Sequence, residues 1–207
     1  MIETLKIYPV LKNICKSVKD NSLTIISTPT GSGKTLAVPF SLGIALNRRV
    51  FVTMPRVLLA KQAAYGVVKL ITGEKMSHKI GVMTGKHNQN TNAPLMFCTE
   101  RSFLNRVNLL LDDILIIDEV HEQGINTEEV LYFAKQHVIK GGKVVLMSAT
   151  MDCSRFIEYF GTGSIIELPE SERQFETIIE DCPDNYLDRV VELGGITLIG
   201  VAGKKDI

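Results

Sequence analysis

The sequence has no tryptophan, no closely spaced pair of cysteines and no excess of charge of either sign. The cysteines are far apart and predict neither a zinc site nor a disulfide framework, and reduced thiols are typical of an intracellular protein; they are Cys15, Cys98, Cys153 and Cys182. Lys plus Arg and Asp plus Glu each number 23, so the overall charge gives no support to nucleic-acid binding, although a local basic patch is compatible with it. Without tryptophan or an aromatic run, the chain does not favour recognition of bases by stacking.

Long apolar runs are also missing. None approaches the roughly 20 residues that a helix needs to cross a bilayer, and the first residues, Met1 to Lys6, lack the shape of a signal peptide. We therefore expect no membrane partner and an intracellular location, in the cytoplasm or nucleus or, for a virus-encoded protein, inside the host cell. The hydrophobic share of 45% and charged share of 22% are ordinary for a globular protein with a core.

Apolar β-branched segments alternate with segments of helical periodicity along the chain. Predicted strands lie at 23–28, 50–54, 80–83, 95–98, 114–117 and 143–147. Predicted helices lie within 5–18 and at 36–46, 57–71, 101–111 and 127–138, and the polar stretch 86–92 is expected to be a loop. Strands 114–117 and 143–147 are apolar on both faces, as in the centre of a parallel sheet. The alternation predicts an α/β fold, a parallel sheet flanked by helices on both faces.

Composition changes after residue 169, where a polar, linker-like stretch begins. A new apolar strand is predicted near 195–201, shortly before the last residue, Ile207. We therefore expect one domain at 1–169, with 170–207 forming a linker and the first strand of a truncated second domain.

A glycine-rich loop follows the first predicted strand and precedes a helix. Gly31 and Gly33 let successive backbone N–H groups turn inward towards phosphate oxygens, and the helix N-terminus adds positive potential. Lys34 is predicted to reach the β- and γ-phosphates, and the Thr35 hydroxyl to bind Mg²⁺. Thr28 stands where the strict pattern has Gly, and a small β-branched residue is compatible with a strand end. The whole predicted ATP-binding segment is Thr28, Pro29, Thr30, Gly31, Ser32, Gly33, Lys34 and Thr35.

Two acids, Asp118 and Glu119, come directly after the apolar strand 114–117. Ligands of open α/β sheets bind at the carboxyl ends of strands, so these acids are expected to share a crevice with Lys34 and Thr35. Asp118 is predicted to hold Mg²⁺ through its water shell, and Glu119 to polarise or deprotonate the attacking water. Glu119 is also counted among the candidate metal ligands.

Three motifs in order identify a resemblance: 28–35, then Asp118-Glu119-Val120-His121, then Ser148-Ala149-Thr150. They resemble motifs I, II and III of superfamily 2 helicases, and the second is a DExH box. Its continuation through Glu122, Asn126 and Thr127 is similar to the DEAH-box branch, as are Met151-Asp152 and the segment Ile7-Tyr8-Pro9-Val10. Thr53-Met54-Pro55-Arg56 resembles motif Ia, and Phe97-Cys98-Thr99-Glu100 resembles motif Ib.

The resemblance implies a RecA-like domain that hydrolyses ATP with Mg²⁺ under stimulation by single-stranded nucleic acid, with RNA favoured over DNA. It implies that His121 belongs to the catalytic set and links it to a second domain, and that Ser148, Ala149 and Thr150 couple the two ligand sites. The implied nucleic-acid contacts are Pro55, Arg56, Thr84, Gly85, Thr99 and Glu100. Such contacts fix position on the backbone without reading sequence.

The resemblance also implies a second RecA-like domain, in cis or in trans, because the motifs with the arginine fingers are absent from the sequence. Arginine fingers contribute on the order of 10³–10⁵ in rate to related phosphoryl transfers. We therefore expect this chain alone to hydrolyse ATP slowly and not to unwind a duplex. Two alternatives stay open: a non-catalytic, nucleotide-dependent interaction module and, less favoured by Ser148-Ala149-Thr150, a small-molecule kinase.

Overall fold

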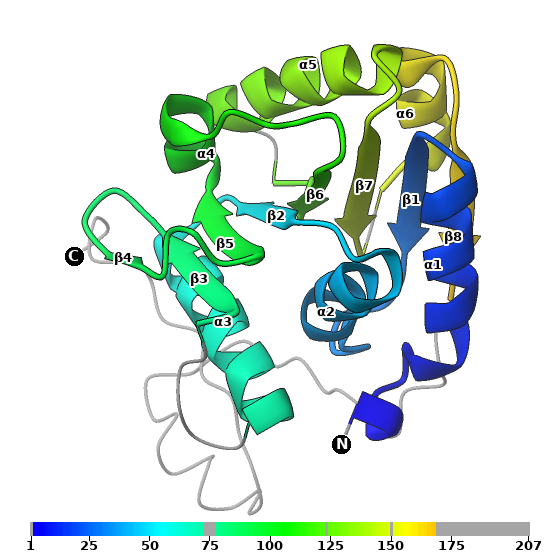
Figure 1. Cartoon of the computed structure of the whole chain (residues 1–207). Helices are drawn as coiled ribbons and strands as arrows, with labels where there is room; N and C mark the ends of the chain where they lie inside the picture. The colour runs from blue at the N-terminus through cyan, green and yellow to red at the C-terminus, as the bar shows by residue number, and fades with distance from the viewer. Residues whose placement is uncertain (1, 73–77, 123, 150, 169–207) are drawn as a thin grey trace, which may run out of the picture. The chain divides into compact units, whose positions relative to one another are not determined.

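The computed structural model describes residues 2–72, 78–122, 124–149 and 151–168. Across this part of the chain one sheet has the strand order β4-β3-β5-β2-β6-β7-β1-β8, and every neighbouring pair is parallel except β3 and β4 (Figure 1). The strands are β1 (Leu23–Ser27), β2 (Val50–Met54), β3 (Ile80–Met83), β4 (Asn88–Gln89), β5 (Leu95–Thr99), β6 (Ile114–Asp118), β7 (Lys143–Ser148) and β8 (Ser164–Glu167).

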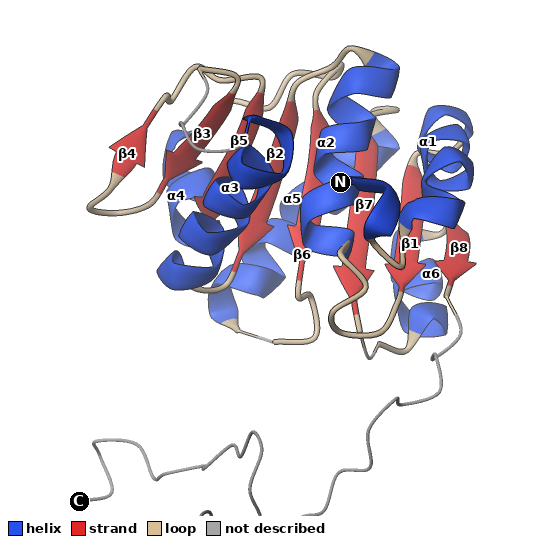
Figure 2. Cartoon of the chain, turned by 90° about the horizontal axis from the view of Figure 1, so that it is seen from below, coloured by secondary structure: helices blue, strands red, loops and turns tan. Residues whose placement is uncertain are grey.

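Helices cover both faces of this sheet (Figure 2). One face carries α1 (Leu11–Asp20), α2 (Lys34–Leu46) and α3 (Val57–Thr72), and the other carries α4 (Glu100–Arg106), α5 (Ile125–Ile139) and α6 (Cys153–Phe160). Alternate residues of the buried strands feed the two cores: Ile116 packs in the first and Leu115 in the second. The predicted α/β, RecA-like architecture is confirmed.

The central strands explain this architecture. All five residues of β2 and of β6 are buried, and the two strands pair in parallel with Val50 opposite Ile114 and Thr53 opposite Ile117. A strand buried on both faces tolerates a continuous apolar run, and such runs are typical of parallel sheets covered by helices. Because these strands run parallel, their carboxyl ends gather at one edge of the sheet.

Several elements differ from the sequence-based expectation. Helix α4 ends at Arg106, not near 111, because Asp113 organises a turn: its carboxylate accepts a bond from the Leu110 N–H at 2.8 Å, and its own N–H donates to the Leu110 carbonyl at 3.0 Å. The stretch 86–92 is not all loop, since β4 pairs antiparallel with β3. Two 3₁₀ turns, η1 (Ile2–Thr4) and η2 (Tyr8–Val10), precede α1, and α6 and β8 were not anticipated.

The predicted linker and second-domain strand, residues 170–207, lie outside the described residues. The boundary at 169 therefore stays a prediction.

Candidate nucleotide and nucleic-acid site

The predicted site segments all follow the carboxyl ends of parallel strands, so the fold places them along one edge of the sheet. The strand order divides them into two groups. The loops after β1, β6 and β7 are neighbours and carry the predicted nucleotide residues. The loops after β2, β5 and β3 lie further along the same edge and carry the predicted nucleic-acid residues. We call these the nucleotide half and the outer half of the edge.

The glycine loop has the backbone shape that phosphate binding requires. Gly31 and Gly33 adopt left-handed φ values of 74° and 87°, a region that side chains disfavour. Helix α2 begins directly after Gly33, whose carbonyl accepts the N–H of Ala37 at 2.9 Å. A cavity of about 230 Å³ opens there and is lined by Thr30, Gly31, Gly33, Lys34, Thr35 and Glu119. A helix N-terminus that opens into a cavity of this kind suits an anion.

Thr28 braces the loop instead of replacing a needed glycine. Its hydroxyl lies 3.1 Å from the buried Ser32 hydroxyl, and its N–H donates to the Ser148 carbonyl at 3.1 Å. The Ser32 carbonyl accepts the N–H of Ile7 at 3.0 Å, which joins the N-terminal segment to the loop. Thr28 and Ser32 thus hold the loop against β7 and the N-terminal segment. Pro29 contributes its carbonyl, which accepts the Ser32 N–H at 3.3 Å.

Asp118 and Thr35 meet as predicted. The Thr35 hydroxyl donates to Asp118 Oδ2 at 2.6 Å, and Asp118 is fully buried. Burial raises the pKa of Asp118 to about 6; the Thr35 bond and Lys34 oppose this rise, while the charge of Glu119 adds to it. A hydroxyl and a carboxylate side by side are the hard oxygen ligands that Mg²⁺ takes, usually one or two from protein with the rest from phosphate and water. This donor set therefore fits Mg²⁺, although no group of three or more acidic, His or Cys side chains suited to a metal occurs among the described residues.

Glu119 faces both the phosphate loop and the Ser148 segment. One carboxylate oxygen lies 3.7 Å from Lys34 Nζ, and the other lies 3.3 Å from His121 Nδ1. The same His121 nitrogen lies 2.9 Å from Ser148 Oγ. Glu119 has a left-handed φ of 54°, rare for a residue with a side chain, and its N–H donates to Asp118 Oδ1 at 2.9 Å. An uncommon backbone conformation at a candidate general base is consistent with a functional constraint on its direction.

The third predicted motif is only partly described. Ser148 is buried at the end of β7 and contacts His121, and Ala149 follows it half-buried. Thr150 lies outside the described residues. Lys34 and Glu119 line one cavity, and Ser148 is linked to it through its contact with His121, so three chain segments far apart in sequence meet here.

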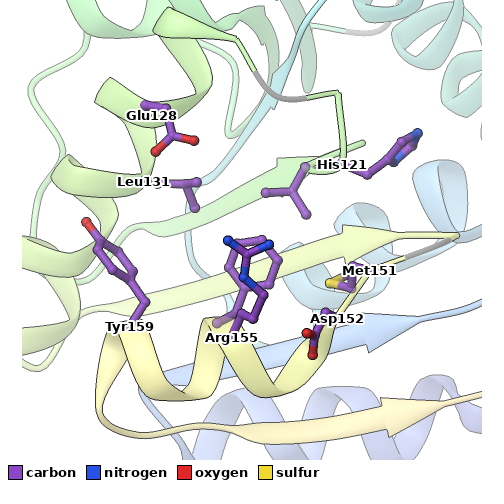
Figure 3. Close-up of a pocket in the computed structure, with 9 residues that line it drawn as sticks. His121, Glu128, Leu131, Met151, Asp152, Arg155 and Tyr159 are labelled. Atoms are coloured by element: carbon purple, nitrogen blue, oxygen red, sulfur yellow. The ribbon is translucent and has the colours of Figure 1, made fainter.

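A second hollow of about 270 Å³ lies between α5 and α6 and shares His121 with the nucleotide half (Figure 3). Figure 3 shows Glu128 and Leu131 on α5 facing Arg155 and Tyr159 on α6. No sequence pattern indicated this hollow, because part of its lining comes from α6, a helix that was not predicted. It contains none of the phosphate-loop residues, so the smaller cavity is the nucleotide candidate; the hollow is lined by Val120, His121, Glu128, Leu131, Met151, Asp152, Arg155, Phe156 and Tyr159.

In the outer half, the predicted contacts are split between exposed and buried positions. Arg56 and Gly85 are exposed, and Pro55 is half-buried. Thr84 and Glu100 are buried. The Thr84 hydroxyl donates to the carbonyl of His87 at 2.9 Å, within its own turn.

Motif Ib residues also bond inward. The Thr99 hydroxyl donates to Ser102 Oγ at 2.9 Å, and Glu100 accepts a bond from the Thr127 hydroxyl at 2.9 Å. Burial raises the pKa of Glu100, the Thr127 bond opposes this, and the charge of Glu122 adds to it. These two side chains are therefore buried and hydrogen-bonded within the fold at the end of β5.

Two residues without a predicted role take part in the site. Glu122 forms an ion pair with Arg56, and Thr127 contacts Glu100. Both belong to the extension of the DExH box. The resemblance includes this extension but does not indicate which residues Glu122 and Thr127 contact. Their contacts join segments 66 and 27 residues apart, which no local pattern reveals.

A sequence model of the family described as DEAD/DEAH box helicase matches residues 8–158 of this chain. RNA editing associated helicase 2 of Trypanosoma brucei brucei is 32% identical over 92% of the chain, and human ATP-dependent RNA helicase DHX30 is 30% identical over 80%. ATP-dependent RNA helicase HrpA of Escherichia coli is 28% identical over 95%. The chain spans only 9%, 15% and 17% of the lengths of these three relatives. None of the helices in the described ranges is long and apolar enough to cross a membrane.

Proposed function

This chain belongs to the DEAD/DEAH box helicase family, and on that premise we propose that it is the ATP-binding half of an RNA helicase, which couples hydrolysis of Mg²⁺-bound ATP to the binding of single-stranded RNA. One observation carries the proposal. Lys34, Thr35 and Glu119 line one cavity, and Asp118 bonds to Thr35 at its edge. These are the groups that phosphoryl transfer to water requires, brought together from two strand ends.

Each residue of the nucleotide half has a defined task. The loop 28–35 surrounds the phosphates with N–H groups, and Lys34 neutralises the β- and γ-phosphates. Thr35 and Asp118 hold the Mg²⁺, which when bound offsets charge on the transferring phosphate. Glu119 orients the attacking water and accepts its proton, and His121 fixes the Glu119 carboxylate through the 3.3 Å contact. Ser148 steadies His121 through the 2.9 Å contact, and Ala149 and Thr150 continue this coupling segment.

The outer half binds the phosphate backbone of a single strand. Arg56 supplies a positive charge next to Pro55, and backbone groups near Thr84, Gly85, Thr99 and Glu100 complete the track. RNA is favoured over DNA because relatives covering most of this chain are named RNA helicases. Contacts of this type bind without reading sequence.

A second RecA-like domain, in cis or in trans, supplies the arginine fingers. Without it, this chain hydrolyses ATP slowly and does not unwind a duplex, because no arginine stabilises the charge that develops on the transferring phosphate in the transition state. An intracellular site of action belongs to the same proposal.

The test is a steady-state ATPase assay of this chain alone, with single-stranded RNA, and with RNA plus a polypeptide that carries the second domain. We expect slow turnover in the first two mixtures and RNA-stimulated turnover in the third. Brisk RNA-stimulated turnover by the chain alone would contradict the need for the second domain. ATP binding without turnover in any mixture would instead identify a non-catalytic regulatory module.

A further inference from the structure

One ion pair crosses from the outer half of the edge to the nucleotide half. Arg56 follows β2, and Glu122 follows the DExH box after β6. Arg56 Nε donates to Glu122 Oε2 at 3.1 Å, and the terminal nitrogen Nη2 lies 3.0 Å from the same oxygen. The Arg56 side chain is 69% exposed and that of Glu122 only 28%. The arginine can therefore leave the pair towards solvent, whereas the glutamate is held in the fold.

The backbone of Glu122 is fixed on two sides. Its N–H donates to the Glu119 carbonyl at 2.9 Å, which closes the turn that carries the candidate general base in its left-handed conformation. Its carbonyl oxygen lies 3.3 Å from the Thr127 hydroxyl, which also reaches Glu100 at 2.9 Å. Glu122 is thus the residue at which the Glu119 turn, the start of α5 and the motif Ib segment meet.

The Glu122 carboxylate, paired with Arg56, opposes the binding of a phosphate to that arginine. A guanidinium that already serves a carboxylate offers less net positive charge to a second anion, and the carboxylate itself repels a phosphate. Glu100 is a second acid near Glu122, because the Thr127 hydroxyl contacts both the Glu100 carboxylate and the Glu122 carbonyl. A nucleic-acid phosphate that binds Arg56 must therefore compete with Glu122.

We propose that Glu122 is a positioning residue that holds Arg56 back from nucleic acid and transmits the release of Arg56 to the turn that carries Glu119. When a phosphate of the strand takes Arg56, the Glu122 side chain is freed, and the Glu119–Glu122 turn loses one of its restraints. The nucleotide half and the outer half are thereby coupled through a single ion pair. The inference rests on the proposed function, since it assumes that ATP and RNA bind to this chain.

The test uses Glu122→Gln, which keeps the size and backbone bonds of the residue and removes its charge. The affinity of the chain for a fluorescein-labelled oligouridine is measured by anisotropy, and its affinity for a fluorescent non-hydrolysable ATP analogue with Mg²⁺ is measured with and without saturating oligouridine. We expect the variant to bind oligouridine roughly two- to fivefold more tightly, the range of exposed ion pairs. The ratio of the two nucleotide affinities, which reports coupling between the sites, moves towards one.

Two further variants make the result specific. In an Arg56→Ala background, Glu122→Gln has a smaller effect on oligouridine affinity than in the unsubstituted chain, because the competition for Arg56 is gone and only the direct repulsion of phosphate by the carboxylate is removed. An equal effect in both backgrounds overturns the proposal. Glu129→Gln removes an equal charge from the exposed Arg101–Glu129 pair on α4 and α5, with a 3.9 Å separation, and leaves both measurements unchanged. If Glu129→Gln reproduces the effect of Glu122→Gln, overall charge is responsible and the proposal is wrong.

Other outcomes separate this inference from the proposed function. Weaker oligouridine binding by Glu122→Gln, or an unchanged coupling ratio, overturns the inference and leaves the helicase assignment intact. Failure of the unsubstituted chain to bind either oligouridine or the ATP analogue overturns the proposed function itself, and the inference with it.

Discussion

The nucleotide half and the outer half of the sheet edge are built differently. In the nucleotide half, the predicted side chains contact one another: Thr35 with Asp118, Lys34 with Glu119, and His121 with both Glu119 and Ser148. In the outer half, the side chains of Thr84, Thr99 and Glu100 turn inward to partners within the fold. Among the ion pairs of the described residues, the one between Arg56 and Glu122 joins the two halves.

The ligands proposed for the two halves account for this difference. Triphosphate chemistry needs particular charged and hydroxyl side chains at fixed separations, so these must meet in space before the ligand arrives. A nucleic-acid backbone can be held by main-chain N–H groups at strand ends, for which the side chains serve as internal supports. In the nucleotide half, side-chain contacts join the glycine loop to the DExH box, whereas in the outer half the side chains of Thr84, Thr99 and Glu100 bond within the fold.

The largest effect is expected from a side chain added to Gly33. Gly33→Val must adopt φ near 87° and place its Cβ 3.0 Å from the Leu5 side chain, which together cost about 2–5 kcal/mol of unfolding free energy. Nucleotide binding should be lost with it. Gly85→Val is the matched control in the outer half, where nothing lies within 4 Å of the added Cβ, and should change unfolding free energy by less than about 0.5 kcal/mol. Urea unfolding measures the stability of both variants, and nucleotide titration measures their affinity. Equal effects of the two substitutions would contradict the proposed difference between the halves.

The next largest effect is expected from loss of the buried hydrogen bond between Thr127 and Glu100. Thr127→Val leaves the buried Glu100 carboxylate without its hydroxyl donor, and we expect a loss of about 1–3 kcal/mol in unfolding free energy. Thr127→Ser keeps the hydroxyl and should recover most of it. Chemical denaturation at neutral pH measures the change. A valine variant as stable as the original would show that Glu100 is not a support of the outer half.

The pH dependence of Mg²⁺ binding sharpens the account of the nucleotide half. Because burial raises the pKa of Asp118 to about 6, its carboxylate is ionised above that pH and becomes protonated below it. The factor by which Mg²⁺ increases the affinity for ATP should therefore fall about tenfold for each pH unit below the pKa of Asp118. Titration of a fluorescent ATP analogue with and without Mg²⁺ measures this. Asp118→Asn should show a weak and flat Mg²⁺ response; a persisting pH step would assign the titration to another group.

The smallest effect is expected at the exposed arginine of the outer half. Arg56→Ala should lower oligouridine affinity several-fold and reduce its salt dependence by about one phosphate contact. Stability should hardly change, because exposed ion pairs contribute about 0–1 kcal/mol. Arg101→Ala, which also removes an exposed paired arginine, is the control and should leave binding intact. Equal losses from both variants would indicate a general charge effect.

The sequence predicted β1, β2, β3, β5, β6 and β7, and the proximity of Lys34 and Thr35 to Asp118 and Glu119, for physical reasons. Buried parallel strands are continuous apolar runs, and the chemistry of phosphate transfer restricts the residue types of 28–35 and 118–121. Prediction failed where structure depends on distant contacts. β4 is two residues long and exists through pairing with β3, and α4 stops where Asp113 forms its turn. The Arg56–Glu122 and Glu100–Thr127 contacts likewise depend on strand order, which no local pattern encodes.

The most direct test of the central claim is the affinity of Lys34→Ala for Mg²⁺-bound ATP, measured by calorimetry alongside the unsubstituted chain, with circular dichroism to verify that both are folded. Lys34 is almost fully buried beside Glu119 at the cavity, so loss of its charge-assisted phosphate bonds should weaken binding about 10- to 100-fold. Unchanged affinity in a folded Lys34→Ala variant would contradict the account, because the triphosphate would then bind somewhere other than the ends of β1 and β6.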